Sequence, residues 1–509
     1  MSHTPPFAVV DTGSNAIRFL VARLGPSGQL EELDSLRAPV RLGHQVFLRG
    51  RLAPEAMDAA VRAFVGFRER MDALGVERIQ AVATSAVREA RNGDLLVRRI
   101  RREAGIDLEI ITGTEEARLV HRAVASRIDL TGRQWILVDL GGGSVEVSLV
   151  DDQGMLWSES HTMGSVRLLE EVAEGTRDPG RIRTLLEEYV SILRIPSPAQ
   201  YWTPGGFVAT GGNIEALVKL AGASPDESGT SRLATRDLDG LIQLLARLSW
   251  RERIRQLDLR EDRADVILPA ALVYYRLARE SGAGEILVPH VGLKEGLLLD
   301  LAERVTRPEG RAVRVADDLR RSAISLGRRF MFDEAHGVQT ARLALLLFDR
   351  LRDLHGLEDR DRQLLEVAAL LHDVGLFIGF RKHHKHSLYI LSRSELPGLG
   401  PEENLLVANV ARYHRKSHPR DHHSEYMRQS PANRLRTDQL AALLRIADAM
   451  DRQHLQRVKE LHIRVEGLRI FLKPEGEGDL LLERWALSKK KSLFEETFGF
   501  TVEVDAEHE

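Results

Sequence analysis

The sequence predicts an α/β protein of two similar lobes, followed by an all-α domain and a small α+β module. Strand-like apolar runs alternate with helix-like segments up to about residue 300, and only helix-like segments follow. Alternating apolar and charged residues return at about residue 459. Because 509 residues are too many for one hydrophobic core, we expect four parts. Their expected boundaries are residues 1–133, 134–305, 306–458 and 459–509.

The composition is that of a globular protein without special partners. Hydrophobic residues make up 43% of the chain and charged residues 29%. The net charge of −3 gives no overall attraction to nucleic acid, and no segment approaches the roughly 20 apolar residues that span a bilayer. The chain has no cysteine, and its first residues do not resemble a signal peptide. We therefore expect a cytoplasmic protein with neither a membrane nor a specific nucleic-acid partner.

The first lobe begins with an apolar strand, residues 7–10, that leads into a small polar turn. Apolar residues spaced along one face predict a helix over residues 54–74. Short strands are expected at residues 79–83 and 108–111, and a helix opens at Thr114 after the second of them.

The second lobe repeats this beginning. Residues 135–138 form an apolar run that ends in Asp139, and glycines follow. Further strands are expected at residues 207–210 and 285–288. Each lobe thus starts with a strand that ends in Asp before a Gly/Ser turn, which suggests a pseudo-repeat. A cleft between two such lobes is a common place for a ligand.

Three strand-then-glycine turns predict a phosphate-binding site. Each turn taken singly is equally consistent with a tight hairpin, but three of them favour loops whose N–H groups converge on one phosphorylated ligand. Asp139 and Glu146 flank the second turn and are expected to hold a divalent cation. The predicted phosphate-binding residues of the turns are Asp11, Gly13, Ser14 and Asn15; Gly141, Gly142, Gly143 and Ser144; and Gly211, Gly212 and Asn213.

Three further charged residues of the lobes have both an ordinary and a functional interpretation. Glu116 lies in the first turn of a predicted helix, where carboxylates commonly complement the helix dipole. In a catalytic role, it would orient a water molecule and take its proton during attack on phosphorus. Arg18 and Arg88 are either surface residues or guanidinium groups that clamp phosphates.

The rest of the chain starts with a charged, broken stretch at residues 303–316, which suggests a linker. Helices are expected after it, and strands at 461–465 and 468–472. The expected helices cover residues 335–354, 362–371, 402–413 and 437–454.

His336, His372, Asp373 and Asp448 lie in this helical part and form a sufficient set for a divalent metal. The alternative is a group of buried polar residues that hold the helices together. Four more histidines could add metal ligands or line a basic groove for polyanions: His384, His386, His414 and His418. Basic clusters at residues 381–386, 412–416 and 489–491 would extend such a groove, although a charge cluster is usually only a solvated face.

The motifs together resemble the exopolyphosphatase/guanosine pentaphosphate phosphohydrolase (Ppx/GppA) family, which belongs to the actin-like (ribonuclease H-like) ATPase superfamily. The segments that carry the resemblance are Asp11–Asn15, Thr84–Arg88, Gly113–Arg118, Asp139–Glu146, Thr210–Asn213 and Gly292–Gly296. The helical part looks like that of the long bacterial exopolyphosphatases, through residues 386–391, 396–398 and 412–416. The adjacent His372 and Asp373 resemble the pair that is characteristic of HD-domain phosphohydrolases.

The resemblance implies a role for each of these residues. Glu116 would be the catalytic base, Asp139 and Glu146 would bind Mg²⁺, and Arg88 would clamp the substrate beside the three turns. It also implies a homodimer in which the HD-like domain completes the substrate channel. Two departures stand out. Asn213 replaces a small hydroxyl residue, and His372-Asp373 stands where the long enzymes often carry His-Glu, so that a second hydrolytic site is conceivable.

The function that we expect is release of terminal orthophosphate from linear inorganic polyphosphate by Mg²⁺-assisted attack of water. The basic helical part favours this substrate. An alternative reaction at the same site is hydrolysis of the 5′ γ-phosphate of guanosine pentaphosphate (pppGpp), with pppGpp or ppGpp as ligand. An alternative of a different class is a non-catalytic alarmone or polyphosphate sensor, against which Glu116 and the two metal carboxylates argue.

Overall fold

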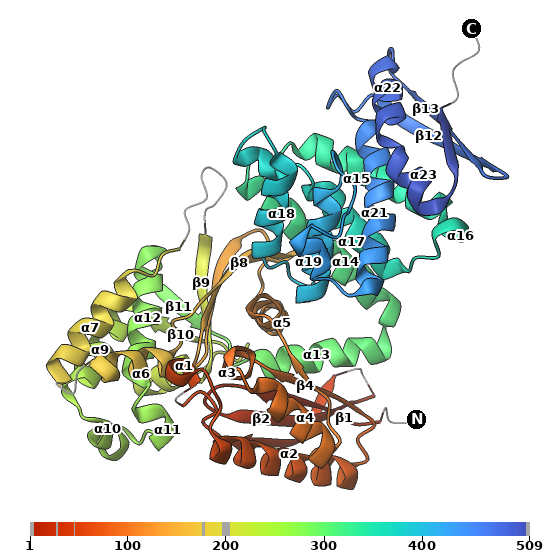
Figure 1. Ribbon diagram of the computed structural model, residues 1–509. Helices are drawn as coiled ribbons and strands as arrows, with labels where there is room; N and C mark the ends of the chain where they lie inside the picture. The colour runs from red at the N-terminus through yellow and green to blue at the C-terminus, as the bar shows by residue number, and fades with distance from the viewer. Residues whose placement is uncertain (1–4, 27–28, 45, 176–178, 196–203, 505–509) are drawn as a thin grey trace. The chain divides into compact units, whose positions relative to one another are not determined.

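The computed structural model describes residues 5–26, 29–44, 46–175, 179–195 and 204–504 (Figure 1). Two compact units, Met1–Val313 and Arg314–Glu509, make up the chain and are described separately. Residues 1–4, which belong to the stretch examined for a signal peptide, lie outside the described residues. Among the described helices, none has the length and apolar character needed to cross a membrane. The division into four parts stays a prediction.

The first sheet of unit 1 has five strands in the order β3-β2-β1-β4-β5. Its strands are β1 (Phe7–Thr12), β2 (Ile17–Leu24), β3 (Leu30–Ala38), β4 (Arg78–Ala83) and β5 (Leu108–Ile110). The first three form an antiparallel meander, and β4 and β5 continue the sheet parallel to β1. The strands predicted at residues 79–83 and 108–111 are confirmed within one residue at each end.

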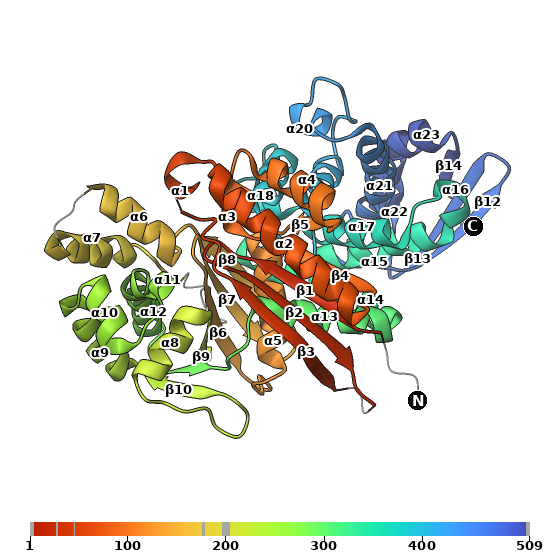
Figure 2. The same ribbon diagram turned by 90° about the horizontal axis from the view of Figure 1, so that it is seen from below.

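Alternation along β1 divides the apolar side chains of this sheet between two cores. Ala8 and Val10 pack on one face with α2 (Pro54–Leu74) and α4 (Gly93–Ala104), and α2 has the predicted bounds. Figure 2 shows α2 lying along this outer face. Phe7 and Val9 point to the opposite face. The short helices α1 (Val46–Arg49) and α3 (Ser85–Glu89) belong to the same lobe.

The second sheet repeats the order of the first. Its order is β10-β11-β9-β6-β7-β8, in which β6, β7 and β8 form the meander and β9 and β11 run parallel to β6. Its strands are β6 (Gln134–Leu140), β7 (Val145–Asp151), β8 (Gly154–His161), β9 (Pro204–Thr210), β10 (Ser231–Ala234) and β11 (Glu285–Val288). The predicted pseudo-repeat and the actin-like two-lobed architecture are thereby confirmed.

Two helices form a layer that both sheets share. The helices are α5 (Gly113–Ala125) and α13 (Leu293–Thr306), and Figure 1 shows α5 between the two sheets. One apolar cluster contains Val9 of the first sheet, Val120 of α5, Leu297 of α13, and Leu137 and Val208 of the second sheet. Burial on both sides fixes α5 relative to both sheets, and α5 carries Glu116.

The outer face of the second sheet is covered by the remaining helices of unit 1. Ile136 and Val138 of β6 pack there in one cluster with Ile214 and Tyr274. The helices are α6 (Ser165–Gly175), α7 (Pro179–Ser191), α8 (Gly212–Leu220), α9 (Thr235–Arg247), α10 (Trp250–Leu257), α11 (Glu261–Ala264) and α12 (Ile267–Glu280).

Unit 2 is helical up to a small C-terminal sheet. Its helices are α14 (Pro308–Arg329), which begins before the boundary, α15 (Glu334–Arg350), α16 (Arg352–His355), α17 (Asp359–Leu371), the 3-10 helix η1 (Val374–Phe377), α18 (His383–Arg393), α19 (Pro401–Arg412), α20 (Ser424–Met427), α21 (Pro431–Ala449), α22 (Leu481–Lys490) and α23 (Ser492–Phe498). The sheet consists of β12 (Val458–Glu466), β13 (Arg469–Gly476) and β14 (Thr501–Val504), as predicted for two of its strands.

Two expectations for this region need comment. The stretch 303–316 was expected to be a broken linker. The boundary between the two units does fall in it, after Val313, but the stretch is helical, because α13 ends at Thr306 and α14 begins at Pro308. Its charges are typical of exposed helical residues, so composition alone did not separate a helix from a linker. The sheet also shares one apolar core with the helices, because Ile470 and Leu472 pack in the same cluster as Leu443.

The contact between α5 and α13 gives a stability prediction. A Cβ at Gly296 of α13 would lie 2.0 Å from the backbone oxygen of Leu119 in α5. The Gly296→Ala substitution should therefore force the helices apart and lower the free energy of unfolding by about 1–3 kcal/mol, as measured by urea unfolding. Gly240→Ala is the matched control. Gly240 lies exposed in α9 with no atom within 4 Å of the added Cβ, so stability should stay equal or rise. Equal effects of the two substitutions would contradict the packing argument.

Candidate active site

The turns that follow β1 and β6 have the same geometry and different chemistry. In each, the first glycine donates its N–H to the carbonyl three residues on, at 3.2 Å for Gly13 and 3.0 Å for Gly141. The strands continue the equivalence, with Asp11 opposite Arg18 in the first hairpin and Asp139 opposite Glu146 in the second. The first pair is an ion pair, 2.7 Å from Arg18 Nη1 to Asp11 Oδ2. The second places two like charges side by side, which is unfavourable without a cation.

Glu116 adds a third carboxylate to this pair. Thr112 caps α5 by accepting a hydrogen bond from the Glu115 N–H at 3.2 Å, which places Glu116 in the first helical turn. One oxygen from each of Glu116, Asp139 and Glu146 lies within 4.8 Å of the others. Glu116 and Glu146 are only 7% and 1% exposed. We call these three residues the acidic trio.

Burial raises the pKa of every member of the acidic trio, and repulsion within the trio adds to this for Glu116 and Glu146. For Glu146, burial is the larger cause and the neighbouring Asp139 the second, and together they raise the pKa to about 7. For Glu116, burial followed by Glu146 and Asp139 raises the pKa well above its usual range, against a smaller opposing effect of Arg88. The pKa of Asp139 is raised by burial, although a hydrogen bond from Thr210 opposes the rise.

The remaining hydrogen-bonding capacity of the acidic trio fits a divalent cation. Thr210 Oγ1 donates to Asp139 Oδ1 at 2.6 Å, and Ser160 Oγ donates to Glu146 Oε1 at 2.9 Å. Within the described residues, Glu116 Oε2 and Glu146 Oε2 are buried and accept no hydrogen bond. A buried carboxylate oxygen without a donor is costly unless a cation neutralises it. The donors are all carboxylates, the ligand type that suits Mg²⁺ and Mn²⁺.

Close packing makes glycine necessary at two positions of the turns. A Cβ on Gly143 would lie 2.4 Å from the Phe47 ring and 2.5 Å from Ser85 Oγ. Gly211 has φ of +103°, a conformation that L side chains rarely adopt. Glycine therefore lets the second turn approach Phe47 and Ser85, and it lets the third turn adopt its backbone conformation.

The turns and two of the three carboxylates line one cavity of about 470 Å³. Glu116 and Asp139 lie in its wall, together with Gly13, Gly141 and Gly212. Five cationic side chains also line it: Arg18, Arg37, Arg260, Arg263 and Lys294. Among the described lining residues there is no Phe, Tyr or Trp.

Most of the cationic residues were not predicted. Lys294 lies in the motif Gly292–Gly296, so the sequence contained a signal for it. Arg37 lies on the partly exposed strand β3, and Arg260 and Arg263 lie at α11, where no motif marks them. Their approach to the turns depends on contacts that are distant in sequence, such as Arg263 Nη1 to Asn213 Oδ1 at 2.6 Å.

Several predicted phosphate-binding residues have protein partners instead of facing the cavity. Arg88 is not in its wall: Arg88 Nη1 donates to the Ile111 carbonyl at 2.7 Å and lies 3.8 Å from Glu116 Oε2. Gly143, Ser144 and Glu146 also lie behind the wall. Asn213 lines it, but its amide donates to Ser165 Oγ at 3.1 Å and its oxygen accepts from Arg263. Arg88 is thus placed to orient Glu116.

The four residues of the predicted second metal set also come together, within unit 2. His336 Nε2 lies 3.2 Å from His372 Nε2, and Asp448 Oδ1 lies 3.6 and 3.7 Å from these two nitrogens. Asp373 Oδ2 lies 3.7 Å from His372 Nε2. Of the four additional histidines proposed from the sequence, His414 contacts Asp373, whereas His418 pairs with Glu496. His383, which the sequence analysis did not select, contacts Asp373 as well.

Two family profiles match the chain. The profile of the Ppx/GppA phosphatase family matches residues 20–305, and that of Ppx/GppA phosphatase, domain III, matches residues 319–488. Together they cover both units of the structure.

Individual proteins are also similar to the chain. A protein of Vibrio vulnificus (strain YJ016), named guanosine-5′-triphosphate,3′-diphosphate pyrophosphatase, is 29% identical over 423 residues, which is 81% of each chain. The crystal structure of an exopolyphosphatase from Cytophaga hutchinsonii is 26% identical, with a TM-score of 0.55, over 58% of this chain and 98% of that one. The crystal structure of an exopolyphosphatase-like protein is 25% identical, with a TM-score of 0.52, over 59% of this chain and 98% of the other.

The motifs, the repeated sheet topology and the acidic trio between the two sheets agree with these similarities. The family match extends over more than half of the sequence. The chain therefore belongs to the Ppx/GppA phosphatase family.

Proposed function

We propose that unit 1 is an Mg²⁺-dependent exopolyphosphatase, which releases terminal orthophosphate from linear inorganic polyphosphate. The observation that carries this proposal is the single cavity in which Glu116, Asp139 and the glycine turns face five cationic side chains. A polyphosphate is a chain of anionic groups, and such a lining neutralises several of them at once. The similarity to a solved exopolyphosphatase supports the same substrate.

The chain's own residues supply the base and the anion-binding groups of this mechanism. Glu116, with its raised pKa and its unsatisfied Oε2, accepts the proton of the attacking water. The water oxygen forms a bond to the terminal phosphorus while the anhydride P–O bond breaks, which gives orthophosphate and a shortened chain. Backbone N–H groups of the turns bind the phosphoryl oxygens. Asp139 and Glu146 would hold Mg²⁺, and a bound Mg²⁺ would supply positive charge that offsets the charge of the phosphoryl group.

A second candidate is hydrolysis of the 5′ γ-phosphate of pppGpp, which the name of the Vibrio relative favours. Both reactions break a terminal phosphoanhydride bond and need the same base and metal ligands. One observation argues against pppGpp as the substrate: the described cavity wall contains no Phe, Tyr or Trp that would stack on a guanine. A homodimeric state and a cytoplasmic location stay predictions.

The first test concerns the base. Replacing Glu116 by Gln keeps the shape of the side chain but removes the proton acceptor, so kcat for phosphate release should fall by about 100- to 10,000-fold with little change in KM. The control is Glu109→Gln, at an exposed carboxylate on β5 of the same lobe, which should keep wild-type kinetics. Normal turnover by the Glu116→Gln protein would disprove the mechanism.

The second test separates the candidate substrates. Initial rates on long-chain polyphosphate and on pppGpp, measured with the same enzyme and saturating Mg²⁺, should give the higher kcat/KM for polyphosphate. A higher value for pppGpp would favour the second candidate. Tight binding of either compound without phosphate release would instead support the sensor hypothesis.

The third test uses the pH dependence of stability. Glu146 has a pKa of about 7 in the folded protein against 4.5 for the ordinary carboxyl, so the folded state binds more protons than the unfolded state between these values. In the presence of a chelator, stability should therefore fall as pH rises through this window up to about pH 7. Mg²⁺ should restore stability most strongly above about pH 7, where the acidic trio is ionised.

Thermal unfolding with and without Mg²⁺, at about pH 5.5 and about pH 8, measures this effect. Glu146→Gln cannot ionise, so its melting temperature should show a smaller pH-dependent difference and should lose most of the Mg²⁺ effect. If wild-type protein and this variant respond alike, the acidic trio is not the metal site.

A further inference from the structure

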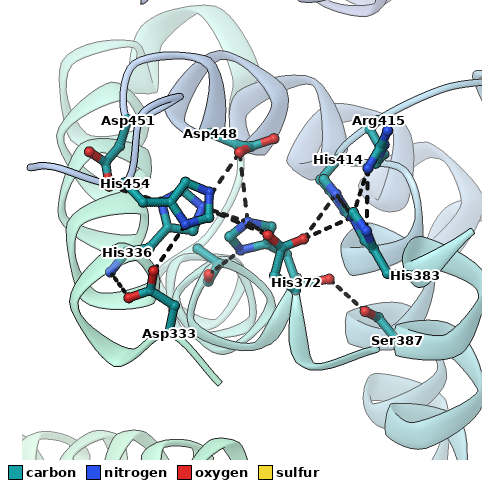
Figure 3. Close-up of polar contacts among 12 residues, drawn as sticks. Asp333, His336, His372, His383, Ser387, His414, Arg415, Asp448, Asp451 and His454 are labelled. Carbon is teal, nitrogen blue, oxygen red and sulfur yellow. Dashed lines mark hydrogen bonds and ion pairs between the residues drawn. The ribbon is translucent and has the colours of Figure 1, made fainter. Parts of the chain in front are cut away.

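A second cluster of metal-ligand side chains lies in unit 2, away from the cavity of unit 1 in sequence. Figure 3 shows His336, His372, His383, His414 and Asp448 pointing toward a common centre. They come from α15, the end of α17, α18, the residue pair after α19, and α21. Asp373, at the start of η1, completes the cluster. The four histidines are 0–3% exposed, so the ligand atoms are held inside the helical core.

Asp373 joins two groups of histidines through its two oxygens. Its Oδ2 lies 3.7 Å from His372 Nε2 and 4.0 Å from His336 Nε2. Its Oδ1 lies 3.1 Å from His383 Nε2 and 3.3 Å from His414 Nε2. Despite these distances, Oδ1 is buried and accepts no well-formed hydrogen bond from any residue that the structure describes. A carboxylate with one oxygen toward each group is the arrangement of a bridging metal ligand.

The ring nitrogens on the outer side of the cluster show which nitrogens are available as ligands. His372 Nδ1 lies 2.7 Å from the Ala369 carbonyl, and His414 Nδ1 lies 2.7 Å from the Ala411 carbonyl. A carbonyl accepts only, so each of these Nδ1 atoms carries the proton, and Nε2 of a neutral ring has a lone pair. The same reasoning holds for His383, whose Nδ1 lies 3.1 Å from the Phe380 carbonyl.

His336 has the fourth such contact, because its Nδ1 lies 2.8 Å from Asp451 Oδ2. The Nε2 atoms then face each other in two pairs, 3.2 Å apart for His336 and His372 and 3.2 Å apart for His383 and His414. Two facing lone pairs repel each other unless a proton or a metal ion lies between them. An outer hydrogen bond from each imidazole to a carbonyl or carboxylate is also what orients histidines that bind metals.

We infer that these six side chains form a dinuclear centre for divalent transition-metal ions, whose substrate is a phosphate ester. One ion takes His336, His372, Asp448 and one oxygen of Asp373, and the other takes His383, His414 and the second oxygen of Asp373. Mixed imidazole and carboxylate donors suit Mn²⁺, Fe²⁺ or Zn²⁺, in contrast to the carboxylates of the acidic trio.

The ligand count indicates a catalytic centre instead of a structural one. Neither ion has more than four protein ligands, so positions stay open for water and for substrate oxygens. Lys490 forms an ion pair with Asp448 Oδ2, which leaves Oδ1 directed at the histidines, and Arg415 Nη1 lies 3.1 Å from His383 Nε2. These two cations stand beside the metal positions, where they can bind the oxygens of an anionic phosphate.

The reaction that this centre supports is hydrolysis. The oxygen of a metal-activated water forms a bond to phosphorus, the P–O bond to the alcohol oxygen breaks, and the water proton passes to that oxygen. The products are a phosphate and an alcohol, and no oxidant, reductant or other co-reactant is consumed.

The metal content of the full chain tests the centre independently of the function of unit 1. After the Glu146→Gln protein, whose acidic trio has lost a metal ligand, is loaded with Mn²⁺ and free metal is removed, mass spectrometry should find about two ions per chain. The further substitutions are made in this parent protein. His383→Ala and His336→Ala should each lose about one, and Asp373→Asn should lose most of both. His418→Ala is the control, because His418 pairs with Glu496 outside the cluster, and it should keep the metal content of the parent protein.

A result of one ion or fewer in the Glu146→Gln parent protein overturns the dinuclear centre, and so does an unchanged content when His383→Ala is added. Anomalous scattering from a wild-type crystal soaked in Mn²⁺ avoids the risk that a variant fails to fold. Two peaks flanking Asp373 support the inference, and their absence overturns it.

Activity tests the substrate class. Glu116→Gln removes the proposed base of unit 1, so that p-nitrophenyl phosphate and bis(p-nitrophenyl) phosphate report only on other sites. Release of p-nitrophenol from one of them should require Mn²⁺ and should fall at least about 100-fold when Asp373→Asn is added. Hydrolysis of neither substrate by the metal-loaded protein, or release that Asp373→Asn leaves unchanged, overturns the hydrolytic assignment.

Discussion

The like charges of Asp139 and Glu146 determine the character of unit 1. They stand opposite each other on neighbouring strands, and Glu116 reaches them from α5. Three carboxylates at this distance, two buried and Asp139 half-buried, are stable only as protonated groups or beside positive charge, because burial and repulsion both oppose their ionisation. The hydroxyl groups of Thr210 and Ser160 stabilise one oxygen each and leave the others available. Arg88, 3.8 Å from Glu116 Oε2, supplies part of the positive charge that this site requires, and a bound cation would supply the rest.

The internal repeat contains this arrangement twice, once as an ion pair and once as a pair of carboxylates. Asp11 and Asp139 occupy the same position in equivalent hairpins, as do Arg18 and Glu146. The first hairpin neutralises its aspartate within the protein, and the second replaces that arginine by an acid. The same glycine turn thus occurs twice, once beside an aspartate that is neutralised by an arginine and once beside a pair of carboxylates. The shared apolar layer of α5 and α13 holds the two versions together.

The sequence predicted those features that depend on residues close to one another along the chain. The bounds of α2, the strands before each turn and the spacing from Asp139 to Glu146 are local, and the structure contains them. The partners of Asn213 and the positions of Arg37, Arg260 and Arg263 depend on packing between distant segments. Periodicity cannot give the rotation of a short helix about its axis, so it could not select His383 over His384 and His386 in α18. Composition also could not show that residues 308–316 are helical, since the exposed surfaces of helices are as rich in charged residues as linkers are.

The middle layer of unit 1 has a consequence for the way in which substitutions act at a distance. Glu116 belongs to a helix that packs against both sheets, while Asp139 and Glu146 belong to the second sheet alone. The distance between Glu116, the proposed base, and the other two carboxylates consequently depends on the size of apolar side chains such as Val120, Leu137 and Leu297, none of which lines the cavity. The thickness of this hydrophobic layer therefore determines the spacing of the carboxylates on which the proposed reaction depends.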